Sequence, residues 1–516
     1  MPRVFLSHKQ IGRLLSSPWI RVDSRGLVRF TLPPDNAVSP AVQASAQLAA
    51  YISARMPLLL DPTDSRPIHF VGIAGAGMSA LAELFVLRGI KVSGCDAHPE
   101  NAPDLTLRGI VVQQGHAPDH VSGARALVVT SAMPRNHPEL ERARALGLPV
   151  VRRADALGDA TRGTMLVGVA GTHGKSTTTV LTTEALAAAG FNPTGYVGAR
   201  VTSWHGNLRP GRPDWFVVEA DEYDRSFLAL SPTVAVVTNL EADHLDIYED
   251  IDDLRRTFAQ YLRNARYIVL CADDAEANRL PTPPSAEVIR YGLTSPDARL
   301  RATDLQREGL GTRFNVAYDG KMLGDVALAV PGEHNVRNAL AALAVGLGLG
   351  ATVQAMASGI GSFTGVERRF QFLGSAGDVM IVDDYAHHPT EVRASVQAAR
   401  AAAPDRRLVV AFQPHLFSRT RDFARDFAVA LAEADVVCLL DIYGAREQPM
   451  TGVTSALIAT AMTSLGRAPA WSGARSALAG AFDDLVKPGD LVVTMGAGDV
   501  TRSGHALLAS LEAKRA

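Results

Sequence analysis

One stretch of the sequence, residues 165–179, constrains the fold more than any other; it reads MLVGVAGTHGKSTTT. An apolar run ends in the glycine-rich segment 171–176, and a helical pattern follows over 180–189. A strand, a glycine loop and a helix in this order gather backbone N–H groups and the positive end of a helix dipole around one point, which suits a bound phosphate. The stretch therefore favours a nucleotide-phosphate loop over a glycine turn that merely starts a helix.

The side chains of this loop point to a nucleoside triphosphate. Lys175 is expected to reach the β- and γ-phosphates, and Ser176 to place its hydroxyl on Mg²⁺. Val169 stands where the longer loop pattern has its first glycine, so the loop is the shorter GxxGK[ST] variant. The expected ATP contacts here are Gly171, Thr172, His173, Gly174, Lys175, Ser176 and Thr177.

A second glycine loop, residues 72–80, follows an earlier apolar strand. Gly75, Gly77 and Ala80 fit GxGxx[G/A], and Asp96 ends the next strand about 20 residues on, where dinucleotide-binding folds place an acid for a ribose hydroxyl. Alone, this loop is typical of an NAD-dependent dehydrogenase. The alternative is that its glycines are needed only for tight packing of the strand against the helix. Two such loops on one chain instead favour two nucleotides, or one nucleotide and one nucleotide-linked substrate.

The length of 516 residues predicts about three domains. Strands and helices alternate through residues 67–162, 163–367 and 368–516, a rhythm that predicts α/β domains with parallel sheets. Residues 300–330 read as short antiparallel strands inside the second domain. Residues 1–66 form an N-terminal extension to which the sequence assigns no chemistry.

Composition excludes some partners. The net charge of −2 gives no basic field for nucleic acid or an anionic membrane. No segment reaches about 18 uninterrupted apolar residues, so we expect a cytoplasmic chain without membrane insertion. Cys95, Cys271 and Cys438 lie in or beside apolar runs, which favours core thiols over disulfides or a zinc site. The oligomeric state stays open.

Acidic residues follow two strands of the second domain. Because parallel strands deliver their carboxyl ends to one edge of a sheet, these acids are expected beside the phosphate loop, where they suit Mg²⁺. The alternative is that they are solvated helix N-caps. The residues are Glu219, Asp221 and Glu222 after the first strand, and Asn239, Glu241, Asp243 and His244 after the second. Of these, Glu219 and His244 are expected to hold the metal together with Ser176. Because Mg²⁺ prefers oxygen ligands, the alternative for His244 is a base or a residue that orients a metal ligand.

The third domain repeats the plan. One predicted strand is followed by the polar residues 383–390, which include His387. The next strand is followed by His415, Arg419 and Arg421. A guanidinium fork can clamp a carboxylate with two N–H bonds, so an arginine here suits a ligand that carries a carboxylate. The alternative is a basic helix start that faces solvent.

At this point the motifs resemble the Mur ligases, the ATP-dependent amide-forming enzymes of peptidoglycan synthesis. The similar segments include HFVGIAGAGMS, GVAGTHGKSTTT, VVEADEYDRSFL, TNLEADHLD, PGEHNVRNALAA, DDYAHHPTEVR and FQPHLFSRTRDF, in one order from about Pro67 onward. The resemblance implies a three-domain Mur-ligase-like architecture: a Rossmann-like uridine-nucleotide domain, a central P-loop ATPase domain and a C-terminal Rossmann-like amino-acid domain.

The resemblance also implies site residues. The UDP-substrate contacts would be Gly75, Ala76, Gly77, Met78, Asp96 and Ser131. Further ATP contacts would be His334, Asn335, Asn338 and Arg369. The amino acid would meet His387, His415, Arg419 and Arg421, and the residues expected to carry the chemistry are Lys175, His244, His387 and Arg419.

The implied reaction joins L-alanine to the lactyl carboxylate of UDP-N-acetylmuramate, with ATP and Mg²⁺, through an acyl phosphate. The QPH…SRTRD stretch favours alanine over the tripeptide that a sister group uses in cell-wall recycling. A non-catalytic nucleotide-binding regulator is the other alternative, against which Lys175, Glu219, His244 and Arg419 argue. The sequence leaves open a preference for alanine over serine or glycine, and the residue that deprotonates the amine.

Overall fold

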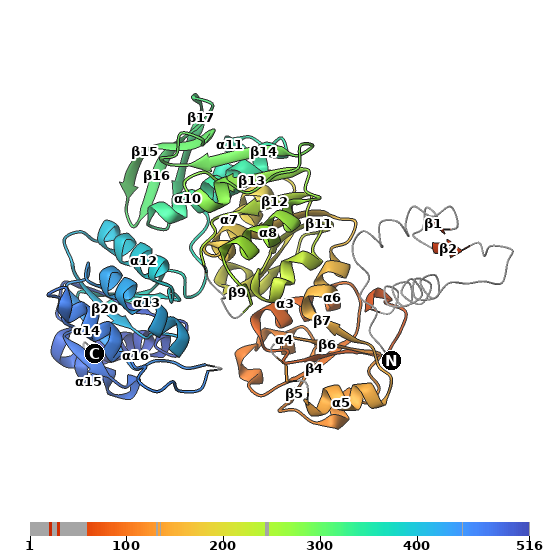
Figure 1. The fold of residues 1–516 in the computed structure, drawn as a ribbon, viewed down its shortest axis with the longest axis horizontal. Coiled ribbons are helices and arrows are strands. Elements are labelled where there is room, and N and C mark those ends of the chain that lie inside the picture. Colours follow the sequence, from red (N-terminus) through yellow and green to blue (C-terminus); the bar gives the residue numbers. More distant parts are fainter. Residues whose placement is uncertain are drawn as a thin grey trace. The chain divides into compact units, whose positions relative to one another are not determined.

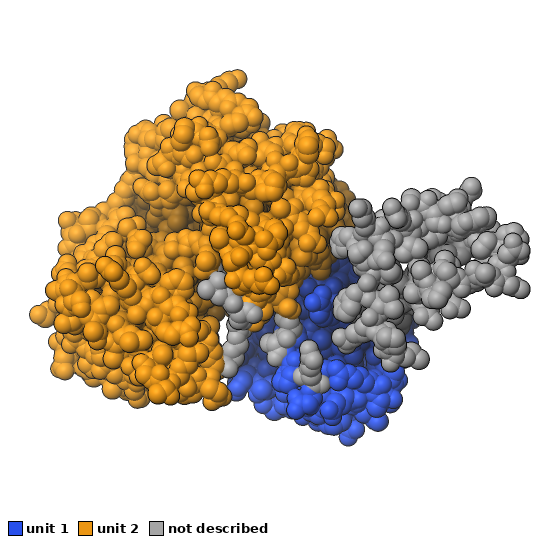
Figure 2. Space-filling view, viewed as in Figure 1, with its two compact units in different colours: residues 1–160 blue, residues 161–516 orange. Residues whose placement is uncertain are grey.

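The chain forms two units, residues 1–160 and 161–516, shown in different colours in Figure 2. The computed structural model describes residues 59–130, 133–134, 136–242, 247–445 and 447–514, together with the backbone of the antiparallel pair β1 (Ile20–Val22) and β2 (Val28–Phe30). Most of the predicted extension, and the predicted site residues Ser131 and His244, lie outside the described residues.

Strand β8 (Met165–Ala170) carries the first phosphate loop, with the bounds that the sequence predicts, and it lies inside the largest sheet, most of whose other strands are labelled in Figure 1. The other strands of this sheet are β9 (Pro193–Val201), β10 (Gly206–Arg209), β11 (Arg212–Glu219), β12 (Val234–Val237), β13 (Tyr267–Cys271), β14 (Glu287–Gly292), β15 (Leu300–Glu308), β16 (Gly311–Tyr318) and β17 (Lys321–Leu328). Their order is β10-β9-β11-β8-β12-β13-β14-β15-β16-β17. The strands from β9 to β15 run parallel, whereas β16 and β17 continue the sheet antiparallel, as the sequence predicts.

Helices cover both faces of this sheet because its central strands are apolar on both sides. The helices are α7 (Lys175–Ala188), α8 (Ile251–Leu262), α9 (Ala275–Asn278), α10 (Glu333–Gly348) and α11 (Val353–Gly361). One core joins α7, α10 and α11 to Val167 and Val169 of β8. On the other face α8 comes so near that a Cβ at Gly168 would lie 2.2 Å from the Tyr261 hydroxyl. Helices packed on both faces of β8 thereby fix the position of the strand end from which the phosphate loop starts.

A second, six-stranded sheet follows in the same unit. Its strands are β18 (Gln371–Ala376), β19 (Val379–Asp384), β20 (Arg407–Phe412), β21 (Val436–Leu440), β22 (Trp471–Gly473) and β23 (Asp490–Met495). Their order is β18-β19-β23-β20-β21-β22, and all but β18 run parallel. The helices are α12 (Pro389–Ala402), α13 (Phe417–Leu431), α14 (Ala456–Ser464), α15 (Leu478–Leu485) and α16 (Thr501–Ala513). The first three pack on one face and the last two on the other, which is the doubly wound arrangement.

Unit 1 holds a third sheet, of five parallel strands in the order β5-β4-β3-β6-β7. The strands are β3 (Ile68–Val71), β4 (Val92–Asp96), β5 (Val111–Gln114), β6 (Ala126–Val129) and β7 (Val150–Arg152). The helices are α3 (Ala76–Leu87), α4 (Asp104–Leu107), α5 (Pro138–Ala145) and α6 (Arg153–Ala160). Three α/β sheets in chain order confirm the predicted fold class, while the predicted domain boundaries stay predictions. Among the described residues, no helix is long and apolar enough to span a membrane.

Candidate active site

The phosphate loop depends on two glycines in the left-handed region. Gly171 has φ 134° and Gly174 has φ 79°. A Cβ on Gly171 would lie 2.1 Å from the hydroxyl of Thr238, and one on Gly174 would lie 2.7 Å from the amide oxygen of Asn338. Both the backbone angles and the space therefore require glycine here.

The end of β12 holds this loop in place. The backbone N–H of His173 donates to the Asn239 side-chain oxygen at 2.8 Å, and the Asn239 amide donates back to the His173 carbonyl at 3.0 Å. The Thr238 hydroxyl donates to the same carbonyl at 2.6 Å. Helix α7 starts directly afterwards, and the first N–H groups of a helix have no acceptor inside it. The loop is thus preorganised as an anion site.

Glu222 holds Lys175 on the other side of the loop. Its ammonium donates to the carbonyls of Gly171 and Thr172 at 2.7 and 3.1 Å and lies 2.8 Å from a Glu222 carboxylate oxygen. Burial alone would lower the pKa of Lys175, but the Glu222 carboxylate raises it, so the lysine is charged. Sequence reasoning placed Glu222 among the acids near the loop but did not pair it with the lysine.

Ser176 meets the predicted metal-binding acid. Its hydroxyl donates to Glu219 at 3.0 Å, and the same carboxylate accepts the backbone N–H of Gly198 at 2.6 Å. A hydroxyl and a carboxylate are oxygen donors of the kind Mg²⁺ prefers, so the residues present fit that ion.

A cavity of about 340 Å³ opens beside the loop, and residues of both sheets of unit 2 line it. The strands, loops and helices of the first sheet's region supply His173, Gly174, Ser176, Thr177, Thr238, Asn239, Glu241, Cys271, Asp273, Asp274, Tyr291, His334, Asn335, Arg337 and Asn338. The region from residue 369 onward supplies Arg369, Phe370, Asp384, Thr390, Glu391, Ala394 and Ser395. The structure thus brings the expected residues His334, Asn335, Asn338 and Arg369 to one cavity with four loop residues, whereas Gly171, Thr172 and Lys175 do not line it.

Helix α10 presents a fixed polar surface to this cavity. Asn338 accepts the Thr178 hydroxyl at 3.1 Å and donates to Asn335 at 3.2 Å, and Asn335 donates to the Pro331 carbonyl at 2.7 Å. Burial lowers the pKa of His334 to about 4, so its ring is neutral near neutral pH. Neutral ring and amide groups of this kind suit an uncharged heterocycle.

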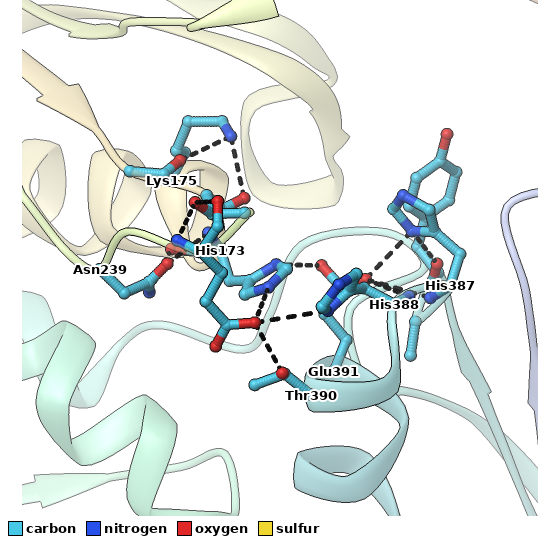
Figure 3. Close-up of polar contacts among 12 residues, drawn as sticks. His173, Lys175, Asn239, His387, His388, Thr390 and Glu391 are labelled. Atoms are coloured by element: carbon cyan, nitrogen blue, oxygen red, sulfur yellow. Dashed lines mark hydrogen bonds and ion pairs between the residues drawn. The ribbon is translucent and has the colours of Figure 1, made fainter. Parts of the chain in front are cut away.

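Glu391 of α12 joins the two halves of the cavity (Figure 3). One of its oxygens lies 3.1 Å from Nδ1 of His173 and 3.5 Å from the Arg369 guanidinium. The other lies 3.0 Å from both the backbone N–H and Nδ1 of His387. A single carboxylate therefore contacts the phosphate loop and the predicted amino-acid region, and nothing in the sequence spacing singled it out.

A second carboxylate, Glu241, makes the matching contact from β12. Its oxygen accepts the Thr390 hydroxyl at 2.7 Å and lies 3.5 Å from ring nitrogens of both His173 and His388. Burial would lower the pKa of His173, but Glu391 and Glu241 together raise it to about 9. His173 is consequently a cation at neutral pH, placed at the edge of a site for anions.

The two candidate arginines of the third domain differ sharply. Arg419 is 7% exposed, whereas the Arg421 side chain is 54% exposed and its fork is paired with Asp422 at 2.7 and 2.9 Å. His387 and His415 lie edge to face, with ring centroids 5.8 Å apart. The structure thus places Arg419 inside and Arg421 at the surface.

The glycine loop of unit 1 is closed by Asp96. One carboxylate oxygen accepts the backbone N–H of Ala74 at 2.9 Å, and the other accepts that of His98 at 2.9 Å. Asp96 therefore holds the backbone of the glycine loop in place. This role is separate from the contact with a ribose hydroxyl that the sequence predicts. A Cβ on Gly77 would lie 2.8 Å from the Arg153 guanidinium, so an arginine that the sequence did not single out rests on the start of α3, beside Gly75, Ala76 and Met78.

Comparisons with known proteins cover all three sheets. The model of the Mur ligase family catalytic domain matches residues 67–164, the Mur ligase middle domain matches 169–346, and the Mur ligase glutamate ligase domain matches 368–498. The UDP-N-acetylmuramate–L-alanine ligase of Salinibacter ruber is 43% identical over 453 residues, which are 87% of this chain and 95% of the relative.

Solved structures agree. The UDP-N-acetylmuramate–alanine ligase of Thermotoga maritima superposes with a TM-score of 0.74 at 28% identity, over 87% of this chain and all of that one. A murein peptide ligase of Psychrobacter arcticus reaches 0.65 at 24% identity, over 87% of this chain and 99% of its own, and shares the fold. With matches over the three sheets and a relative this similar, the chain belongs to the Mur ligase family.

Proposed function

We propose that this chain joins L-alanine to the lactyl carboxylate of UDP-N-acetylmuramate, with cleavage of ATP to ADP and phosphate. The observation that carries the proposal is the cavity whose walls come from the phosphate loop and from the third domain. A ligase must bring a nucleotide and an acceptor to one water-poor place, and this arrangement supplies one. The relatives from Salinibacter ruber and Thermotoga maritima are named for these two substrates.

The family is ATP-dependent, and the cavity suits ATP. Loop N–H groups at Gly174 and Ser176 would hold the phosphates, with Thr177 beside them. His334, Asn335 and Asn338 would surround the base, because their neutral polar groups already form a fixed surface. Arg369 would approach the phosphates from the third domain. Lys175 would leave part of its contact with Glu222 for the γ-phosphoryl group, which carries more charge.

Mg²⁺ would be held by Ser176 and Glu219, which already meet through a hydrogen bond. When bound, the ion would neutralise charge on the β- and γ-phosphates. His244 remains the proposed third metal-contacting residue from the sequence. Glu222 is paired with Lys175, so it is a weaker candidate for a metal ligand.

The sugar nucleotide would bind unit 1 through Gly75, Ala76, Gly77, Met78 and Asp96. N–H groups at the start of α3 suit a diphosphate, and Asp96 would accept a ribose hydroxyl with its remaining lone pairs. Ser131, outside the described residues, completes the proposed set.

The chemistry requires activation of a carboxylate, because its negative charge repels an amine. Transfer of the γ-phosphoryl group to the lactyl carboxylate gives an acyl phosphate and ADP. Attack by the alanine amine then expels phosphate and forms the amide. Preorganised donors at the loop stabilise the charge that spreads in the first step.

The third domain would hold alanine. Arg419 is buried in the region where a carboxylate clamp is expected, whereas Arg421 is already neutralised, so we assign the clamp to Arg419. His387 and His415 would line the same place. Nδ1 of His387 lies 3.0 Å from the Glu391 carboxylate. This contact makes His387, together with His244, a candidate to accept the proton of the alanine ammonium group.

The test is phosphate release with ATP, Mg²⁺ and UDP-N-acetylmuramate against a panel of L-alanine, glycine, L-serine, D-alanine and a muramyl tripeptide. We expect L-alanine to give the highest kcat/KM and a product heavier by one alanyl residue in mass spectrometry. The Lys175→Ala variant serves as the inactive control. If phosphate release requires the tripeptide, the assigned substrate changes from alanine to the tripeptide of cell-wall recycling. NADH binding without phosphate release would overturn the ligase assignment.

A further inference from the structure

Unit 1 contains a buried cluster of metal-ligand side chains that the ligase chemistry leaves unused. Its centre is His69 on β3, Cys95 on β4 and Glu139 on α5, all of them fully buried. One donor atom from each of the three lies within 4.8 Å of the others. Four of the fourteen histidines of the chain gather here, since His116 and His120 contact the same carboxylate and the ring of His137 packs against that of His116.

The distances inside the cluster match those between ligands of one small cation. Cys95 Sγ lies 3.0 and 3.1 Å from the two Glu139 oxygens, and His69 Nε2 lies 3.5 Å from the nearer one. Tetrahedral zinc with bonds of about 2.0–2.3 Å separates its ligands by roughly 3.2–3.8 Å. The donors therefore need to move little to share one ion.

His69 is oriented as metal-bound histidines are. Its Nδ1 is 3.0 Å from the Ser93 hydroxyl, which fixes the ring, while its buried Nε2 points at Glu139 without a hydrogen-bond partner. Metal-bound histidines use one ring nitrogen for the ion and the other for such an anchoring contact. A ring nitrogen left without a hydrogen bond inside a protein is costly unless something else occupies its direction.

A fourth donor stands at the solvent side. His116 Nδ1 lies 3.2 Å from Cys95 Sγ and 3.7 Å from Glu139, and its side chain is 30% exposed. It therefore touches two of the three buried ligands and marks a route for an ion to enter. Nδ1 of His120 lies 3.0 Å from Glu139 and 3.3 Å from the backbone nitrogen of Ala117, so His120 is better placed to orient that carboxylate.

We propose that unit 1 binds one thiophilic divalent metal ion, with Zn²⁺ the best match, through His69, Cys95, Glu139 and His116. One thiolate, two imidazoles and one carboxylate form a donor set that suits zinc and its spectroscopic substitute Co²⁺ and suits Mg²⁺ poorly. Without metal, the Cys95 thiol donates a hydrogen bond to Glu139; binding would replace the S–H bond by an S–metal bond and release that proton to water. Four ligands from β3, β4, the loop after β5 and α5 would tie one face of the sheet together, as in structural sites.

The test is Co²⁺ and Zn²⁺ titration of the full chain after removal of metal with a chelator. We expect one Co²⁺ per chain with a thiolate-to-cobalt charge-transfer band, displaced by Zn²⁺, and a Zn²⁺-dependent rise in melting temperature. Cys95→Ser should abolish the band and weaken Zn²⁺ binding at least about tenfold, and His116→Ala should weaken it about 10–100-fold. His116→Ala also serves where Cys95→Ser fails to fold, because His116 is partly exposed.

The other two buried cysteines provide matched controls. Cys438→Ser removes a buried strand thiol of unit 2, and Cys271→Ser removes the thiol that lines the cavity of unit 2. Both variants should keep the band and the Zn²⁺ affinity. The proposal is overturned if the wild type shows no charge-transfer band, if the band survives in Cys95→Ser, or if it disappears in Cys271→Ser or Cys438→Ser.

Discussion

His173 should make the stability of this protein depend on pH in the alkaline range. The ring lies between Glu391 and Glu241, and these carboxylates raise its pKa from 6.5 to about 9 although burial opposes them. A group whose pKa is higher in the folded state stabilises that state fully below the unfolded pKa. The stabilisation is lost as pH rises through about 9.

The size of the effect follows from the shift. Each pKa unit corresponds to about 1.4 kcal/mol, so protonated His173 contributes about 2–3 kcal/mol at pH 7 and close to nothing at pH 10. The ring is 13% exposed, so solvent screening reduces the figure only modestly. The carboxylates do not titrate in this range, because the pKa values of both Glu391 and Glu241 are lowered.

The perturbation is the double variant Glu241→Gln/Glu391→Gln, which keeps shape and removes both charges. Unfolding in urea is followed at about pH 7 and about pH 10 for the wild type and the variant. The loss of stability should be larger at pH 7 by about 2–3 kcal/mol. Glu333→Gln is the matched control, since that carboxylate is 68% exposed on α10 and should show no such difference. An equal loss at both pH values would refute the cationic state of His173.

Three further predictions concern the proposed reaction. Lys175→Ala should lower kcat by at least ~10³-fold, because the lysine faces the transferred phosphoryl group. Calorimetry should show unchanged UDP-sugar binding, because the glycine loop proposed for that substrate belongs to unit 1. A residual rate above a tenth of the wild-type rate would contradict the prediction. Arg419→Ala should raise the KM for alanine about 10–100-fold, the worth of a bidentate carboxylate pair, with lysine a poor replacement, whereas Arg421→Ala should change it little. The reverse order would exchange the two assignments. Ser176→Ala and Glu219→Gln should each raise the Mg²⁺ concentration that gives half-maximal rate; unchanged Mg²⁺ dependence in both would remove them from the metal site.

Local sequence patterns predicted the elements that carry the site. Strand β8 and the loop at Gly171–Gly174 follow from an apolar run and from glycines at positions that need left-handed angles. The short antiparallel strands that the sequence predicts over residues 300–330 are present as well. These features are encoded within a few residues of one another, so one sequence suffices to find them.

Long-range contacts were not predictable in the same way. Glu391 lies 218 positions from His173, and Glu222 lies 47 positions from Lys175, so no spacing rule relates them. Arg419 and Arg421 sit two positions apart on a helix, where side chains point about 200° apart. The sequence therefore implies that one arginine faces inward, and only packing decides which.

The shared walls of the cavity also bear on inhibitor design. A compound that contacts only the glycine loop would fit many phosphate-loop enzymes, because its hydrogen bonds would go to backbone groups. Ala394 and Ser395 of α12, and Arg369, give the same cavity a wall from another sheet. A compound that reaches this wall should discriminate against unrelated ATPases, and resistance to it should arise by substitutions on α12 that leave the glycine loop intact.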